Sequence, residues 1–277
     1  MKKICFIADF YSDQINGGGE TNDSNLIKHL NKIYSVTCLN SSNTQIDSIS
    51  NYDSFIIGNF INLSEQVKTY LINNKKYIIY EHDHKYVSTR DPSRFHSFSI
   101  PLKDLRNIDF YENSHATVVL SNICKEVMNS NLPNVNCLNI GCSLWSDKKF
   151  NLLEELSQVE KTGDLCLMKS SNPTKNYHRA VEYCTKKSIS FDPISSNSSF
   201  EFLKLMSSYK KFLFMPKVLE TFSRVCAEAK MMNLEVLTNR KLIGFFSEDS
   251  SYLKGIELIN CMKEKNLAAL KLFEDLV

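Results

Sequence analysis

Short apolar segments alternate with amphipathic segments along most of the chain. The apolar segments are rich in Ile, Val, Tyr and Phe, and most are nearly continuous, which is typical of strands buried on both faces of a parallel sheet. In the first part of the chain they lie at residues 3–8, 34–39, 54–58, 76–82, 116–121 and 135–140. A second series lies at 164–168, 188–191, 211–215 and 235–238.

Helical patterns fall between these segments. Leu26, Leu30 and Ile33 are spaced along one face of a helix, behind polar residues 21–24 that can cap it. Alternation of strands and helices predicts βαβ units, and therefore an α/β fold with two Rossmann-like lobes. We expect the lobes at 1–150 and 151–255, with the boundary near residue 150 inside a polar stretch at 143–162. A helical tail over 256–277 could pack back on the first lobe.

Composition and charge narrow the class of protein. The chain has 277 residues, of which 43% are apolar and 23% charged, as expected for a globular protein with a real core. A net charge of +2 gives no strong signal for nucleic acid. The nine cysteines form no CxxC pair, which indicates reduced thiols and a cytoplasmic protein. The N-terminal "MKKICFIADF" predicts a first strand rather than a signal peptide, and no segment approaches the length of a membrane span.

The segment "MPKVLETFSRVCAEAKMM", residues 215–232, places Glu220 and Glu228 eight positions apart. Pro216 ends the preceding strand, so Glu220 is expected in a turn and Glu228 about two turns into a helix. The N–H groups at the start of such a helix form an anion site. Spacing alone favours a simpler interpretation, in which Glu220 interacts with the helix dipole and Glu228 is solvated.

The same segment resembles a known enzyme family. "ETFSRVCAE" followed by "AKMMNLEVLTN" is similar to the E-x7-E region of family-4 retaining glycosyltransferases, which have the GT-B fold. The likeness includes the preceding strand that ends in Pro, and the order of elements fits over most of the chain. It implies two lobes that face a cleft. The N-terminal lobe would be on the acceptor side, and the C-terminal lobe would bind a nucleotide sugar.

The resemblance also implies roles for the residues of this segment. Glu220 would contact hydroxyls of the donor sugar and act in catalysis, and Glu228 would contact the ribose. The backbone amides of Thr221, Phe222 and Ser223 would hold the diphosphate. Hydrogen bonds from hydroxyls to carboxylates are strong and directional, which agrees with these roles.

Two lysines lie in "LMKSSNPTKNYHRA", residues 167–180. The family has Arg and then Lys in this loop, and both neutralise the leaving diphosphate. Lys175 matches the family's lysine and is the candidate catalytic cation. Lys169 stands where Arg is usual, so it offers charge without a bidentate fork. Two exposed loop lysines are the alternative.

A glycine-rich loop, "FYSDQINGGGETNDSNL" at 10–26, is expected between the first strand and the first helix. It is not GxGxxG, and a dinucleotide site is poorly supported. The resemblance implies that Gly18 and Gly19 form a turn that approaches the donor phosphates, because glycine lets backbone come close. A plain flexible turn is the alternative.

Histidines and arginines follow the fourth strand. In "YEHDHKY", His82 is the preferred match to the family's functional histidine near the sugar, and His84 could take that place or contact the acceptor. Side chains that alternate along a strand do not converge on one metal ion. A long loop between His82 and residue 116 carries Arg90 and Arg94, which could hold an anionic acceptor or be solvated.

The sequence therefore predicts a retaining glycosyltransferase that moves a sugar from a nucleotide sugar to a glycan, lipid-linked or other hydroxyl acceptor. The absence of a DxD sequence favours metal-independent chemistry, and no cofactor is expected. The base is expected near "SFDPISS", residues 190–196. A non-catalytic nucleotide- or glycan-binding protein, a nucleotide-sugar epimerase and an enzyme that glycosylates modified DNA are the alternatives. Peripheral membrane contact and the oligomeric state stay open.

Overall fold

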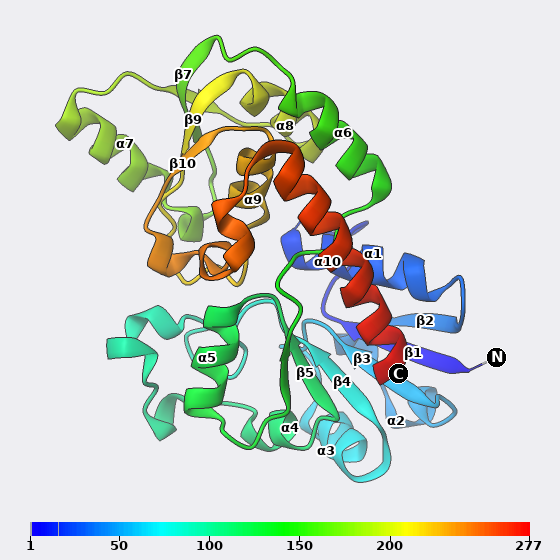
Figure 1. Cartoon of the computed structure of the whole chain (residues 1–277). Helices are drawn as coiled ribbons and strands as arrows, with labels where there is room; N and C mark the ends of the chain where they lie inside the picture. Colours follow the sequence, from blue (N-terminus) through cyan, green and yellow to red (C-terminus); the bar gives the residue numbers. More distant parts are fainter. Residues whose placement is uncertain (1, 16) are drawn as a thin grey trace. The chain divides into compact units, whose positions relative to one another are not determined.

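The computed structural model describes residues 2–15 and 17–277, and they divide into two compact units. Unit 1 runs to Leu144 and adds Lys265–Val277, and unit 2 is Trp145–Glu264. Each unit has its own sheet with helices around it (Figure 1). The predicted α/β fold with two parallel sheets and a C-terminal helix is confirmed.

The sheet of unit 1 has the order β2-β1-β3-β4-β5-β6 among the described strands, and all neighbours are parallel. Every residue of β3, β4 and β5 is buried, which explains the nearly continuous apolar segments. The strands are β1 (Lys3–Ala8), β2 (Ser35–Asn40), β3 (Ser54–Ile57), β4 (Tyr77–Tyr80), β5 (Ala116–Val119) and β6 (Cys137–Asn139).

Helices connect these strands, and the long segment after β4 is more ordered than predicted. It contains three short 3-10 helices and one α-helix, and Tyr86 and Val87 in it are buried. The α-helices of this unit are α1 (Gly18–Leu30), α2 (Ile46–Ile49), α3 (Glu65–Asn74), α4 (Ile108–Glu112) and α5 (Asn122–Asn131). The 3-10 helices of the long segment are η2 (Pro92–Arg94), η3 (His96–Phe98) and η4 (Leu102–Asp104), and η1 (Ser41–Asn43) precedes α2.

Helix α1 begins before its predicted cap. Its N-cap is Gly17, and the polar residues 21–24 lie inside the helix. Asn22 and Asp23 are buried there because they bind other parts of the unit. The Asn22 side-chain oxygen accepts hydrogen bonds from Ser143 Oγ at 2.6 Å and from the backbone N–H of Leu144 at 2.9 Å. The predicted cap is therefore wrong.

The sheet of unit 2 has the order β10-β9-β7-β8, again parallel throughout its described strands. Helices α8 and α9 pack with α6, whereas α7 packs against β7 (Figure 1). Strand β10 lies at an edge of this sheet. The elements are β7 (Gly163–Met168), β8 (Asp192–Ile194), β9 (Tyr209–Leu213), β10 (Glu235–Leu237), α6 (Asp147–Ser157), α7 (Tyr177–Lys187), α8 (Ser199–Ser207) and α9 (Arg224–Met231), with the 3-10 helices η5 (Pro173–Lys175), η6 (Arg240–Leu242), η7 (Gly244–Ser247) and η8 (Asp249–Tyr252).

Two segments of this unit differ from expectation. Residues 188–191 do not form a strand, because Ser188 ends α7 in the left-handed conformation and the N–H of Ile189 bonds back to Cys184. Strand β8 follows at Asp192. The polar stretch 143–162 contains α6, which buries Phe150 and Leu153 at helical spacing and spans residue 150.

Helix α10 (Gly255–Leu276) is one continuous helix whose residues are shared between the units. Its part from Lys265 onward belongs to unit 1, where the ring of Phe273 lies 4.8 Å from that of Tyr80. Figure 1 draws it as the long red helix near the chain end. Among the residues described, no helix is long and apolar enough to cross a membrane.

Candidate functional site

The turn that carries Glu220 is fixed by backbone hydrogen bonds. After β9 the chain continues to Glu220, whose N–H donates to the carbonyl of Leu242 at 2.9 Å. The N–H of Gly244 in turn donates to the carbonyl of Glu220 at 2.9 Å. Both sides of this residue are therefore tied to the segment that follows β10, so the carboxylate leaves the backbone from a defined point.

The structure brings Lys175 and Glu220 together within unit 2. Lys175 Nζ lies 2.8 Å from Glu220 Oε1, and the side chains are 30% and 14% exposed. A second link joins the two loops, because the N–H of Lys217 donates to the carbonyl of Thr174 at 2.9 Å. A partly exposed ion pair adds little stability, about 0–1 kcal/mol. It does place a cation and a carboxylate side by side where a ligand can reach both.

The residues between the two glutamates start helix α9. Ser223 is its N-cap and has φ 67°, which costs about 1–3 kcal/mol for a residue other than glycine. Phe222 is buried, and its carbonyl accepts the N–H of Phe245 at 2.8 Å. The first N–H groups of the helix and the positive end of its dipole lie beyond Thr221, Phe222 and Ser223, which together make a setting for an anion.

Glu228 is buried and bound. Its Oε1 accepts a hydrogen bond from Trp145 Nε1 at 2.9 Å and lies 3.7 Å from Arg224 Nη2. The alternative of a solvated Glu228 is therefore wrong. Sequence reasoning missed both partners. The spacing of Arg224 and Glu228, four residues apart on one helix, was a usable signal for the arginine. No local signal points to Trp145.

A further cation lies near this carboxylate. Lys149 Nζ donates to Ser199 Oγ at 3.0 Å and lies 3.9 Å from the centre of the Phe200 ring. Burial lowers the pKa of Lys149, the charge of Glu228 opposes this shift and Arg224 adds to it. Two cations, Arg224 and Lys149, therefore lie near the Glu228 carboxylate.

Lys169 stands apart from these groups. It follows β7, it is exposed, and its backbone N–H donates to the carbonyl of Ile194 at 2.8 Å. Over the part of the chain that the structure describes, no hydrogen bond or ion pair joins its side chain to Lys175 or Glu220. In unit 2, Lys175 thus contacts Glu220, whereas Lys169 is a surface lysine.

In unit 1, His82 is paired with a carboxylate. It follows β4, and its Nε2 lies 2.7 Å from Asp23 Oδ1, with both side chains buried. Gly18 and Gly19 lie in the first turn of α1, not in a loop before it, which corrects the predicted glycine-rich loop. A Cβ on Gly19 would lie 3.3 Å from the His82 ring, so this glycine allows the helix to approach the histidine. Asp23 was missed because its position suggested a cap.

The other candidates of unit 1 are held by neighbours. His84 is buried, and its Nδ1 lies 3.2 Å from the hydroxyl of Tyr86. Arg90, half-exposed, forms an ion pair with Asp83. Arg94 Nε lies 3.6 Å from Asp91 Oδ2.

A charge network joins Glu81, Asp83 and Lys85, which lie next to the two histidines in the sequence. Lys85 Nζ is 2.8 Å from Glu81 Oε1 and 2.9 Å from Asp83 Oδ1. Burial raises the pKa of Glu81, but the charge and hydrogen bond of Lys85, with a hydrogen bond from Tyr111, outweigh it and lower that pKa to about 2. The network fixes the chain segment that carries both histidines, and sequence reasoning missed it.

Comparisons with known proteins establish the fold. No family model matches the chain, and no curated protein matches it. HepE of Anabaena in complex with UDP and glucose is similar in structure, with a TM-score of 0.54 and 12% identity over 97% of this chain and 90% of that one. An alpha-glucosyltransferase in complex with UDP and a 13-mer DNA containing a HMU base has a TM-score of 0.53 and 11% identity, over 97% of this chain and 89% of that one. WaaG, a glycosyltransferase involved in lipopolysaccharide biosynthesis, has a TM-score of 0.50 and 10% identity, over 98% of this chain and 92% of that one. The chain thus has the fold of GT-B glycosyltransferases.

Proposed function

We propose that the chain is a retaining, metal-independent glycosyltransferase that uses a UDP-sugar as donor. The observation that carries the proposal is the 2.8 Å contact of Lys175 with Glu220 at the turn before α9. A nucleotide sugar combines a diphosphate with hydroxyl-rich rings, and this turn combines a cation and helix N–H groups with a carboxylate. The UDP and UDP-glucose complexes of the structural neighbours support UDP as the nucleotide.

In this proposal each group acts on one part of the donor. Lys175 and the N-terminal N–H groups of α9 bind the diphosphate and stabilise the charge that develops on it as it leaves. Glu220 accepts hydrogen bonds from hydroxyls of the sugar. Glu228 accepts them from the ribose, and Trp145 and Arg224 orient its carboxylate.

The transfer step needs no protein nucleophile. The bond from the anomeric carbon to the diphosphate oxygen breaks, and the acceptor oxygen bonds to that carbon on the same face. The proton of the acceptor hydroxyl passes to the departing diphosphate. The chain then contributes positioning and charge stabilisation. A catalytic role for His82, held by Asp23, rests on the family resemblance.

The acceptor belongs to this proposal only as a hydroxyl compound. A near-neutral net charge favours a glycan or lipid-linked acceptor over DNA, because DNA binding depends on neutralised phosphates. Since one structural neighbour is complexed with DNA, base-modified DNA belongs in an acceptor screen.

Calorimetry with UDP, GDP, ADP and their glucose conjugates tests the donor site. We expect UDP to bind and Lys175→Gln to weaken it by about 10–100-fold, since a hydrogen bond to a charged group contributes about 1.5–3 kcal/mol. Lys204→Gln is the matched control, because Lys204 is an exposed lysine of the same unit that pairs with Glu201. Equal UDP affinity in both variants would contradict the proposed site.

A further inference from the structure

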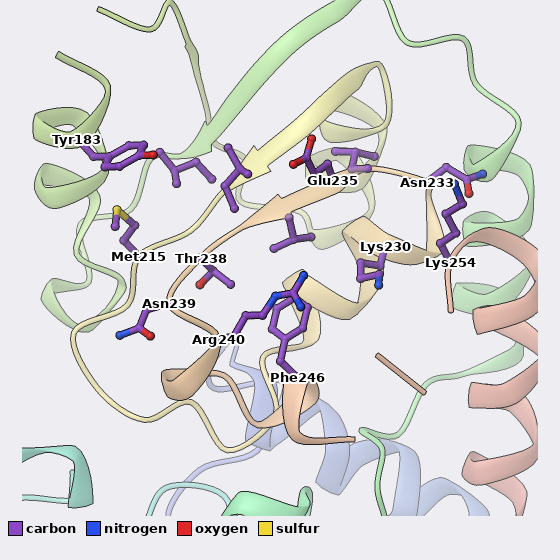
Figure 2. A pocket seen from close by; sticks show the side chains of 14 residues that line it. Tyr183, Met215, Lys230, Asn233, Glu235, Thr238, Asn239, Arg240, Phe246 and Lys254 are labelled. Atoms are coloured by element: carbon purple, nitrogen blue, oxygen red, sulfur yellow. The ribbon is translucent and has the colours of Figure 1, made fainter. Parts of the chain in front are cut away.

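A hollow of about 680 Å³ follows the edge strand β10 in unit 2 (Figure 2). Residues from α7, β9, α9, β10 and the segments after them line it. Lys175, Glu220 and Glu228 do not belong to its lining. The hollow is therefore separate from the candidate donor site, and a ligand bound in it does not depend on the proposed glycosyltransferase activity.

The two ends of the hollow differ in character. Figure 2 shows Tyr183 and Met215 at one end, Lys230 and Lys254 at the other, and Arg240 between them. Met215 packs against the apolar cluster beneath α7. The apolar end is therefore backed by the core of the unit, and the opposite end is cationic.

The cations of the hollow are held by groups other than carboxylates among the described residues. Lys230 donates to the carbonyl of Ser251, and the guanidinium of Arg240 lies 5.0 Å from the centre of the Phe246 ring. Within residues 2–15 and 17–277, no carboxylate forms an ion pair with Lys230, Arg240 or Lys254. Glu235 also lines the hollow, but it lies 3.4 Å from Lys211.

The neighbouring positive charges affect the pKa of Lys230. Burial lowers the pKa of Lys230, and the charges of Arg240 and Lys254 lower it further. Three cations around one hollow repel one another, and an anion placed among them would remove that repulsion. A guanidinium held on an aromatic ring also keeps its fork of donors in a fixed direction, which suits a phosphate.

We infer that this hollow binds a small organic phosphate. The phosphate group lies among Lys230, Arg240 and Lys254, and the apolar part of the ligand lies against Tyr183 and Met215. The volume is within the range of about 300–1,000 Å³ that is usual for small-molecule pockets.

A ligand bound in this hollow would affect the turn of Glu220 through backbone hydrogen bonds. The segment from Arg240 to Phe246 includes Leu242 and Gly244, whose backbone groups hydrogen-bond to Glu220 at 2.9 Å each. A ligand held by Arg240 therefore touches the segment that fixes this turn. We expect it to slow hydrogen exchange of backbone amides across residues 240–246.

Calorimetry of the full chain with phenyl phosphate and with inorganic phosphate tests the inference. We expect phenyl phosphate to bind more tightly than inorganic phosphate. Arg240→Gln should weaken phenyl phosphate by about tenfold or more, because a charge-assisted pair is lost. Tyr183→Ala should weaken phenyl phosphate and leave inorganic phosphate unchanged.

Two lysine variants locate the site. Lys241→Gln is the matched control, because Lys241 is the exposed neighbour of Arg240 and does not line the hollow. Lys175→Gln removes the cation of the candidate donor site and should leave phenyl phosphate affinity intact. Loss of binding in Lys175→Gln with none in Arg240→Gln would place the phosphate elsewhere and overturn the inference. Absence of saturable phenyl phosphate binding to the unaltered chain, or of exchange protection at 240–246, would overturn it as well.

Discussion

The glutamates of the segment 220–228 meet different surroundings although both were expected to bind the same ligand. Glu220 is partly exposed and faces one lysine, so ligand hydroxyls can replace or join its partner. Glu228 is buried, and a buried carboxylate is costly unless it is hydrogen-bonded. Trp145 supplies that bond from 83 positions earlier in the chain. Spacing within the segment predicts where the two residues lie on the turn and the helix. It cannot predict a hydrogen-bond donor as far away in the sequence as Trp145.

Removal of the Glu81 charge tests the buried network at the residue scale. We expect Glu81→Gln to lower the free energy of unfolding at neutral pH by about 3–5 kcal/mol, because Lys85 would keep a buried charge without its main partner. Urea unfolding followed by circular dichroism measures this. A loss below about 1 kcal/mol, the level of an exposed pair, would contradict the network.

The same carboxyl predicts the response to acid. Its pKa in the folded chain is lowered to about 2 from an ordinary value of 4.5. Its contribution to stability is therefore fully present above the ordinary value and is lost as pH falls toward about 2. We expect the difference in unfolding free energy between the unaltered chain and Glu81→Gln to narrow over this range. A difference that stays constant with pH would show that Glu81 does not titrate in this way.

At the scale of elements, the apolar segments predict strands well where both faces are buried, as in β3, β4 and β5. Prediction fails where a tertiary contact or a helix end takes over the residues. The sequence predicts Asp23 as part of a helix cap, but its carboxylate contacts His82. It predicts Ser188 and Ile189 in a strand, but they form the C-terminal end of α7. These outcomes depend on packing partners that are far apart in sequence.

A substitution of Gly58 tests the contact between α1 and the end of β3. A Cβ there would lie 2.7 Å from Asp23 Oδ2, so Gly58→Ala should displace the carboxylate that holds His82. We expect it to lower the free energy of unfolding by about 1–3 kcal/mol, as overpacking does. In a background of Asp23→Ala the same change should cost much less. Equal costs in both backgrounds, measured by urea unfolding, would exclude this clash as the cause.

At the scale of the whole molecule, one unit is built from two separate stretches of chain. The part of α10 from Lys265 onward belongs to unit 1, together with the residues that run to Leu144. Its periodic apolar residues predicted a helix. They did not predict which strand residues it meets, because that depends on the length of everything between them.

The C-terminal helix should therefore contribute directly to the stability of unit 1. Phe273 is fully buried beside Tyr80, and we expect Phe273→Ala to lower the free energy of unfolding by about 3–5 kcal/mol. Leu267→Ala on the same helix is the control, because Leu267 is 67% exposed, and a change within about 0.5 kcal/mol is expected. Similar unfolding midpoints for the two variants would contradict this role of α10.

The turn and the helix that carry the candidate donor site could be predicted from the sequence because their signals are local, whereas the roles of Lys175, Glu220 and Glu228 rest on the family resemblance and stay predictions. The turn and helix at 220–228 and the loop lysine at 175 follow short strands, and such strand ends carry ligand sites in parallel sheets. The partners Trp145, Arg224 and Asp23, and the cationic hollow beside β10, depend on the folded arrangement. They became visible only in three dimensions.

Hydrolysis of UDP-glucose by the full chain, in which water takes the glucosyl group in place of an acceptor hydroxyl, tests the central claim most directly. Release of UDP is followed for the unaltered chain, for Glu220→Gln and for Glu201→Gln, an exposed glutamate on α8 of the same unit. We predict turnover by the unaltered chain and by Glu201→Gln, and a loss of about a hundredfold or more in Glu220→Gln with its circular dichroism spectrum unchanged. Equal turnover in all three proteins, or no nucleotide release from UDP-, GDP- or ADP-glucose, would contradict the claim.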